Sequence, residues 1–537
     1  MRYGKRLVCA LLAALTLTAC GERAEDGQQG FTLRACVCAP LASLDPALCD
    51  DPAAEPVFYA VYDNLMRLSP DGEGGVAVVP AVAKEYETAE NFDGTVDYVF
   101  TLSPSARWSD GARVKAKDFV YAWRRLADPA TEAPDADILS VVSGYDAVRA
   151  SGDATKLGVR AESDGKLCVT LTAPCAYFIS DVCTAVATMP LRADVAERNP
   201  DWAASGGLPC NGPFRISVWA KKESLYLQRN DAYYGSRAMA IRTLRFVFAD
   251  TALDAAHLYA DGAVDYVSPA YAGAEDAGDA PLRSVTCVLY DHMSDVFSNA
   301  HVRRAFDLVL DRAAMAAEAG GGQTAATGFV PRGVVNGGEG ADFRAAGGAL
   351  LAVDEEGYAE RCAEAEDEMR VSGYRSVLDF PEVACLYPLE DGDAAAAAAA
   401  AVRVWQEKLR VPVRAEGLLR EQFDQRVAEG EFDLAIDTFS TPWGDALSYL
   451  APYAGLDGAN ALHYVSKPYD LLIGVAESSR GDARAAILHD AEALLLEDTA
   501  LSPLWFGGKT YLLRDGFAGV FHDARGNAYF SAAYEEA

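Results

Sequence analysis

The spacing of apolar residues along the chain predicts a mixture of strands and helices. Short apolar or alternating runs, typical of strands, occur at residues 31–37, 96–102, 167–171, 225–228 and 243–248. Apolar side chains recur at helical spacing over residues 118–126 and 302–310. We find no repeat of short fixed period, which excludes solenoids and propellers. The pattern therefore predicts an α/β protein.

Two segments of the C-terminal half have a distinct composition. Asp393 precedes eight alanines and an apolar run, which predicts a helix capped by Asp393 that ends near Arg410. Residues 432–436 predict a strand, and residues 437–453 combine aromatic and acidic side chains with Pro442 and Gly444. We expect this second segment to be a loop and the main functional surface of the C-terminal half.

Length and charge narrow the class of protein. The 537 residues exceed the roughly 250–300 at which one hydrophobic core stops growing, so we expect several lobes. The formal charge of −32 excludes nucleic acid as a partner, because binding a phosphate backbone needs a positive footprint. The acidic residues are spread along the chain, which indicates a solvated surface; attraction of cationic ligands is the alternative.

The N-terminus has the order of a secretory signal. Basic residues precede an apolar run over residues 7–17, which is too short to span a membrane as a helix. The run ends at a cysteine after two small residues, which resembles a lipobox: residues 1–19 would be removed and Cys20 lipidated. An ordinary signal with a chance cysteine is the alternative. Residues 20–30 are small and polar and suit a linker. We expect an extracytoplasmic protein anchored to the cell membrane by an N-terminal lipid.

The remaining chemistry of the sequence indicates no catalyst. Ten cysteines remain beside Cys9 and Cys20, and in an exported protein their even number favours some disulfides, with the pairing open. The six histidines are not spaced like metal ligands and the sequence contains no CxxC motif, so we expect no metal site. The Gly-Lys-Thr run at residues 508–510 lacks the first glycine of a phosphate loop. We therefore expect neither an enzyme nor a cofactor.

Several motifs occur in the order of a known family. They are SLDP at residues 43–46, YDNL at 62–65, the stretch from ARWSDG to DPAT at 106–131, NGPF at 211–214 and VRRAF at 302–306. The longest of these is the most specific. Together they resemble the oligopeptide-binding family of ABC-importer solute receptors, extracellular solute-binding protein family 5, and the resemblance spans roughly residues 31–537.

This resemblance implies a two-lobed clamshell of the periplasmic-binding-protein type (type II, cluster C-like) with an extra small inserted domain. Lobe I would comprise residues 31–65, 186–288 and 505–537, the inserted lobe II residues 66–185, and lobe III residues 289–504. Two crossovers are expected near residues 288–291 and 503–506. A ligand that bridges both large lobes would favour the closed state through its differential affinity.

The resemblance also implies where a ligand binds. In the family an extended peptide lies between strands of the two lobes and is held by strand-like hydrogen bonds. The matching residues are Cys38, Ala39 and Pro40 in lobe I, and Asp437, Thr438, Phe439, Ser440, Trp443 and Asp445 in lobe III.

One position departs from the family pattern. Pro442 stands where peptide binders carry an aspartate that pairs with the α-ammonium group of the ligand. Asp445 or Asp437 is expected to take over, with cation–π attraction from Trp443, unless these residues only shape a loop.

The sequence thus predicts a monomeric substrate-binding lipoprotein that captures peptides and delivers them to the transmembrane subunits of an ABC permease. Two alternatives share its features. The same fold could bind a non-peptide solute, or it could sense peptides at the surface without transport.

Overall fold

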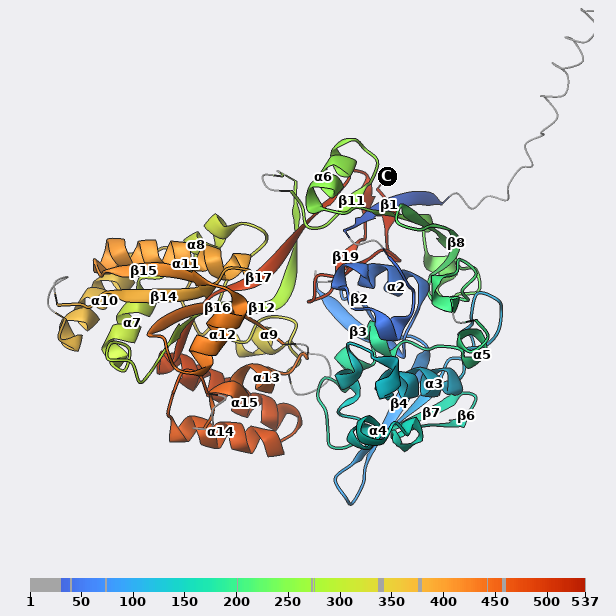
Figure 1. The fold of residues 1–537 in the computed structure, drawn as a ribbon, viewed down its shortest axis with the longest axis horizontal. Coiled ribbons are helices and arrows are strands. Elements are labelled where there is room, and N and C mark those ends of the chain that lie inside the picture. Colours follow the sequence, from blue (N-terminus) through green and yellow to red (C-terminus); the bar gives the residue numbers. More distant parts are fainter. Residues whose placement is uncertain are drawn as a thin grey trace, which may run out of the picture.

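The computed structural model describes residues 30–38, 41–72, 75–199, 201–271, 274, 276–336, 342–374, 379–441, 443–455 and 460–536. The predicted signal, Cys20, Ala39, Pro40 and Pro442 lie outside them. Two large bodies stand apart, and two long strands, β12 (Gly278–Tyr290) and β17 (Leu501–Leu513), run between them (Figure 1). No helix in the described part of the chain is long and apolar enough to cross a membrane.

A single eleven-stranded sheet extends through both bodies. Its order is β15-β14-β16-β12-β17-β11-β1-β10-β9-β8, and β13 pairs with β17. On the first-lobe side, β1 runs parallel to β10, and β10, β9 and β8 are antiparallel neighbours. The elements here are β1 (Phe31–Val37), α2 (Glu55–Val61), α5 (Ala193–Ala196), β8 (Phe214–Ala220), β9 (Ser224–Arg229), β10 (Ile241–Phe248), α6 (Ala252–Ala260), β11 (Tyr266–Val267), β18 (Phe517–Ala518), β19 (Phe521–His522), β20 (Ala528–Tyr529) and β21 (Tyr534–Glu535).

A second, smaller sheet belongs to the segment predicted as the inserted lobe. It is antiparallel in the order β4-β5-β7-β6, and its apolar face shares one continuous core with the first lobe. Its elements are β2 (Met66–Pro70), β3 (Val76–Pro80), β4 (Ala83–Glu90), β5 (Val96–Leu102), α3 (Ala116–Ala127), α4 (Tyr145–Ser151), β6 (Val159–Ser163) and β7 (Lys166–Leu171).

The third lobe packs helices on both faces of its part of the large sheet. Alternate residues of β12 enter different cores: Val288 and Tyr290 join one, whereas Cys287 and Leu289 join the other, because successive side chains of a strand point to opposite faces. The elements are α7 (Ala300–Leu308), α8 (Arg312–Ala319), β13 (Thr324–Ala325), α9 (Phe343–Gly347), α10 (Tyr358–Ser372), β14 (Val383–Pro388), α11 (Gly392–Val404), β15 (Val413–Leu418), α12 (Arg420–Ala428), β16 (Leu434–Ser440), α13 (Ala446–Leu450), α14 (Lys467–Ser478) and α15 (Gly481–Glu497).

The β12–β17 ladder is interrupted where it passes between the lobes. Pro281 pairs with Gly508 and Val285 pairs with Phe506, so three residues of β12 lie opposite a single residue of β17. Such a bulge bends a strand and re-aims its side chains. Gly508 suits this place because a Cβ atom there would lie 1.9 Å from the carbonyl oxygen of Gly322. The exact lobe boundaries stay a prediction.

Most elements expected from the sequence are present. Strands at residues 31–37 and 96–102 have the predicted limits, and the strands at 167–171, 225–228 and 243–248 each lie within a slightly longer one, β7, β9 or β10. The helix expected at 118–126 is part of α3, and the one expected at 302–310 is α7.

Two expectations in the C-terminal half are wrong in detail. The alanine-rich helix α11 is capped by Asp391, whose side chain accepts from the Ala394 N–H, and not by Asp393. Residues 437–453 are not one loop, because β16 continues to Ser440 and α13 follows. Asp445 is the N-cap of α13, so one of the polar residues that suggested a loop marks the start of a helix instead.

The expectation of disulfides is also wrong in this structure. All ten described cysteines are free. Six of them are buried, as in the apolar clusters around Cys183 and Cys287, where a thiol packs as a small hydrophobic group.

Candidate ligand-binding cleft

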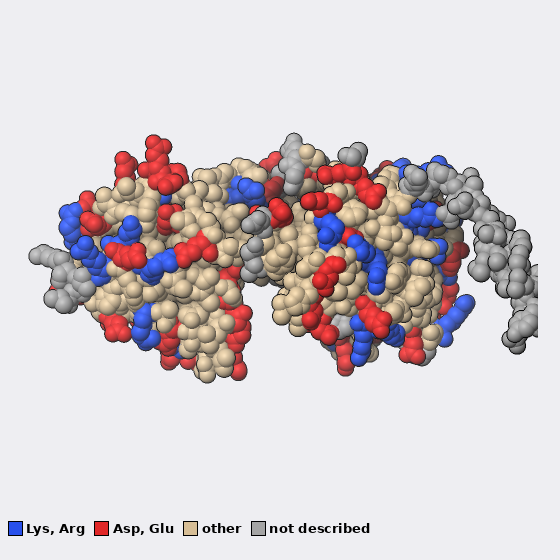
Figure 2. Space-filling view, turned by 90° about the horizontal axis from the view of Figure 1, so that it is seen from above, with Lys and Arg blue, Asp and Glu red and all other residues tan. Residues whose placement is uncertain are grey.

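The end of β16 offers an open strand edge toward the space between the lobes. On one side β16 pairs with β12 along its whole length, up to Ser440 opposite Ser284. On its other side it pairs with β14 only at Leu434 and Ala435, among the residues that the structure describes. Exposure rises along the strand, from buried at Ile436 to exposed at Ser440. Figure 2 shows that the molecular surface is notched between the two lobes.

The carboxylate of Asp437 is already paired with a guanidinium group. Arg420 donates from Nη1 and Nη2 to the two carboxylate oxygens, at 3.0 and 2.9 Å. Burial raises the pKa of Asp437, and the Arg420 pair opposes that shift. Asp437 Oδ1 also accepts from the Thr438 N–H at 2.9 Å, so the side chain satisfies part of the strand edge. A ligand ammonium group would have to compete with Arg420.

Asp445 is held in the same way. Arg484 donates to both carboxylate oxygens at 2.9 and 2.8 Å, and Oδ1 also accepts from the Leu447 N–H as the cap of α13. Its side chain is 12% exposed. Its role as an ammonium anchor stays a prediction, and the geometry assigns it a structural ion pair.

The remaining predicted residues of the third lobe line the strand end in different ways. Thr438 shares a hydroxyl hydrogen bond of 3.0 Å with Thr286 of β12. Phe439 packs edge-on against Phe329, with ring centroids 6.2 Å apart. Ser440 is exposed. The backbone that carries these residues is therefore fixed by packing on one side only.

Trp443 reaches across to the other half of the molecule. Its ring stacks on Tyr177, with centroids 5.4 Å apart and an interplanar angle of 10°, and it packs against the core of the first and inserted lobes. A tryptophan in this position has one face covered before any ligand arrives.

Cys38 lies on the opposite wall, at the end of β1. Its thiol is partly exposed and interacts with the charge of Lys509, and a hydrogen bond from Cys36 is the main reason that its pKa is lowered to about 7. Among the described residues, no hydrogen bond or ion pair links Cys38 to Asp437, Trp443 or Asp445. The predicted site residues thus form two separate walls.

A buried ion pair joins the walls at their base. Arg283 lies in the β12 bulge and donates from Nη1 to Asp181 Oδ1 of the inserted lobe at 2.8 Å, with both side chains at most 10% exposed. The N–H of Gly444, in the third lobe, donates to Asp181 Oδ2 at 3.4 Å. A Cβ atom at Gly444 would lie 2.6 Å from Arg283 Nη1, so a larger residue there would force the guanidinium group to shift.

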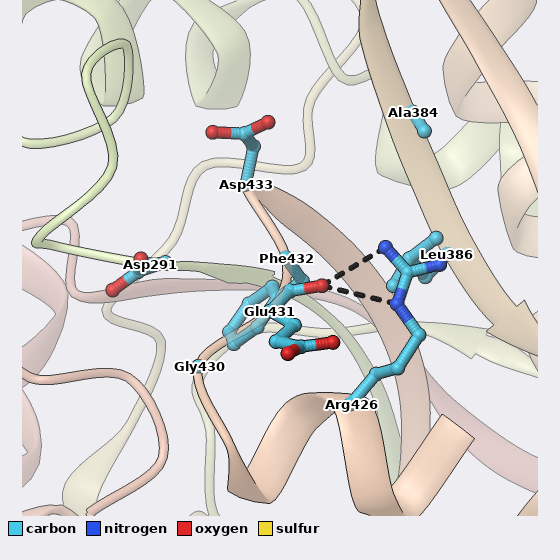
Figure 3. Close-up of a pocket in the computed structure, with 8 residues that line it drawn as sticks. All are labelled: Asp291, Ala384, Leu386, Arg426, Gly430, Glu431, Phe432 and Asp433. Atoms are coloured by element: carbon cyan, nitrogen blue, oxygen red, sulfur yellow. Dashed lines mark hydrogen bonds between the residues drawn. The ribbon is translucent and has the colours of Figure 1, made fainter. Parts of the chain in front are cut away.

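A separate cavity of about 290 Å³ lies at the other end of β16 (Figure 3). Arg426 lines it and donates to the carbonyl oxygen of Glu431 at 3.1 and 2.9 Å. Asp291 and Asp433 are other members of its lining. The guanidinium group of Arg426 therefore bonds within the third lobe, and it lies at the opposite end of β16 from Ser440.

The sequence analysis missed Arg283, Asp181 and Arg484. A single arginine in the otherwise apolar run of β12 was a usable signal, because a charge inside a buried strand needs a partner. Nothing in the sequence indicated that Asp181 would be that partner, since 102 residues separate the two.

Two lobes hinged on a strand pair, with an open strand end between them, define a clamshell binding protein. The family model "Bacterial extracellular solute-binding proteins, family 5 Middle" matches residues 77–461, so this chain belongs to that family. Its members are binding proteins and not enzymes, as the resemblance predicted.

Individual relatives cover nearly the whole chain. The chain is 24% identical to "Oligopeptide-binding protein OppA" of Bacillus subtilis over 98% of both proteins. It is 25% identical to "Probable deoxycholate-binding periplasmic protein YgiS" of Escherichia coli over 92% of both.

Solved structures show the same fold. The murein tripeptide-binding protein MppA in its unliganded open form gives a TM-score of 0.81, at 21% identity, over 94% of this chain and 98% of that one. A second MppA structure, from Escherichia coli, gives 0.62 over the same shares of both chains, at 21% identity. The match to the unliganded open form has the higher of these two TM-scores.

The ion pair at the base of the cleft gives a first prediction. Arg283→Met leaves the Asp181 carboxylate buried without its cation, which should destabilise the protein by about 3–5 kcal/mol. The midpoint of chemical denaturation measures this effect. Arg160→Met, which breaks the exposed pair with Glu162, is the control and should change stability by about 0.5 kcal/mol or less.

The double variant Asp181→Asn with Arg283→Met should be more stable than Arg283→Met alone, because it removes the stranded charge. An Arg283→Met midpoint equal to that of the unmodified protein would show that the pair does not hold the lobes.

Proposed function

We propose that this protein captures peptides between its two large lobes and delivers them to the transmembrane subunits of an ABC importer. The observation that carries the proposal is the open edge of β16 beyond Ala435. An extended peptide can add to such an edge as a further strand, so that its main chain supplies the hydrogen bonds whatever its side chains are. Peptide side chains would then enter water-containing spaces of the cleft.

The open arrangement of the lobes supports this use. Because β16 and the end of β1 lie on different lobes, a ligand that contacts both favours the closed state by its differential affinity. The interrupted β12–β17 ladder is the element that would bend during closure. Relatives named as oligopeptide- and dipeptide-binding proteins add weight to peptides as the ligand class.

A non-peptide solute is the second candidate. The similarity to a relative named as a probable deoxycholate-binding protein favours it, since that relative matches this chain as closely in identity as the peptide binders do. Such a ligand would bind in the same cleft but would not pair with the open edge of β16.

Native mass spectrometry of the purified soluble form, with Cys20 replaced by Ser, separates these candidates. We expect a heterogeneous set of short peptides to be released on denaturation, since main-chain recognition is indifferent to sequence. A single co-purified non-peptide species would contradict peptide capture and support the second candidate.

The proposal includes a lipid anchor at Cys20, supported by the signal and lipobox-like order of residues 1–20. Cys20→Ala should release the protein from the membrane fraction of expressing bacteria, because no other segment was predicted to hold it there. Cys9→Ala, a change within the signal, is the control and should leave the protein membrane-bound. Unchanged membrane association of Cys20→Ala would refute the anchor.

A further inference from the structure

The end of β1 carries two cysteines on the same face of the sheet. Cys36 lies within β1 and Cys38 directly follows the strand, so the two side chains are two positions apart and point to the same side. Both pack against one small apolar cluster, which includes Ala255 of α6, Val267 of β11 and Leu512 of β17. Cys36 is 5% exposed, whereas Cys38 is partly exposed. One thiol of the pair can therefore be reached from solvent.

The two thiols are hydrogen-bonded to each other. The Cys36 S–H donates to the Cys38 sulfur, and this bond is the main reason that the pKa of Cys38 is lowered to about 7 and that the pKa of Cys36 is raised. The Lys509 ammonium group acts on Cys38 in the same direction, whereas burial and the Asp254 carboxylate oppose it. Cys38 is therefore ionised to a large extent near pH 7, and the thiolate is the nucleophilic form of cysteine.

Two other partly exposed thiols are not activated in this way. Burial raises the pKa of Cys49 and of Cys175 to about 12, so both stay protonated near pH 7. Cys38 differs from them in the groups around it and not in its accessibility.

The spacing of the pair permits a disulfide, although a strained one. Residues two positions apart on a strand have Cα atoms about 6.6 Å apart, and disulfides span up to about 6.8 Å. Val37 is the last residue of β1 that pairs with β10, so Cys38 lies outside the ladder. A disulfide that closes so short a loop is strained and is therefore easily reduced again. The pair can thus alternate between dithiol and disulfide.

We propose that Cys36 and Cys38 form a thiol–disulfide exchange site whose substrates are small-molecule disulfides, R–S–S–R. Extracytoplasmic compartments permit oxidised thiols, and this chain belongs to an extracellular family. The inference goes beyond peptide capture and does not depend on it.

The exchange has two steps. The Cys38 thiolate attacks one sulfur of the substrate, so that the mixed disulfide Cys38–S–S–R forms, the substrate S–S bond breaks and one RS⁻ leaves with the proton that Cys38 had lost to solvent. The Cys36 sulfur then attacks the Cys38 sulfur, which forms the Cys36–Cys38 disulfide and releases the second RS⁻ with the proton of Cys36. Two protein thiols are oxidised, and one substrate disulfide is reduced to two thiols.

Mass spectrometry tests this site on the reduced, soluble full-length mature form with Cys20→Ser, treated with oxidised glutathione at pH 7 and then with a reagent that blocks free thiols. We expect a Cys36–Cys38 disulfide, with Cys49 still free. In Cys36→Ser, glutathione should accumulate on Cys38, because the serine hydroxyl can still donate to the thiolate but cannot resolve the mixed disulfide. Cys49→Ser is the control and should behave like the unmodified protein.

The rate of alkylation gives a second readout on the protein without any change at these cysteines. At pH 7 Cys38 should react with iodoacetamide about tenfold or more faster than Cys49, since only the thiolate reacts. Equal rates for the two thiols, or no glutathione on Cys38 in Cys36→Ser, overturn the inference. A mixed disulfide that persists on Cys38 while Cys36 stays free also overturns it, because Cys36 would then not resolve the intermediate.

Discussion

The antiparallel pairing of β12 with β17 is the constraint on which the rest of the architecture depends. Each strand is long enough to serve both large lobes, and the register of the pairing shifts at the bulge between Pro281 and Val285 and again between Thr286 and Cys287. A regular ladder would resist bending, whereas a bulge concentrates the bend in a few residues. Arg283 lies in this bulge and forms the interlobe ion pair with Asp181, so the irregular part of the ladder also carries a contact between the lobes.

The charged side chains of the cleft differ in how completely they are paired. On the third lobe, Asp437 and Asp445 are each neutralised by two hydrogen bonds from an arginine. On the strand that joins the lobes, Lys509 has no arginine-like pairing, and the charges of Cys38 and Asp523 raise its pKa against the larger lowering by burial.

Much of the fold could be predicted because local patterns and ordered motifs agreed. The alternation at residues 96–102 fixed β5, and the motif order gave the two-lobed class that the family match confirms. The end of β16 was misjudged because Asp437 and Ser440 look like loop residues, although Asp437 is paired with Arg420 and stays in the strand.

The candidate site was harder to predict than the fold. A sequence shows where the acidic residues are but not which of them form ion pairs in the folded chain. Asp445 is an example, because its carboxylate is paired with Arg484, 39 residues away. Pairing and burial are properties of the folded chain, and they decide which charges can meet a ligand.

The claim that a ligand draws the two lobes together is tested most directly by small-angle X-ray scattering of the soluble form, before and after addition of peptides that it binds. The account predicts a smaller radius of gyration with bound peptide, in the direction from the open to the closed form, and no change with peptides that do not bind. A radius of gyration that stays constant at saturating peptide would contradict the clamshell mechanism.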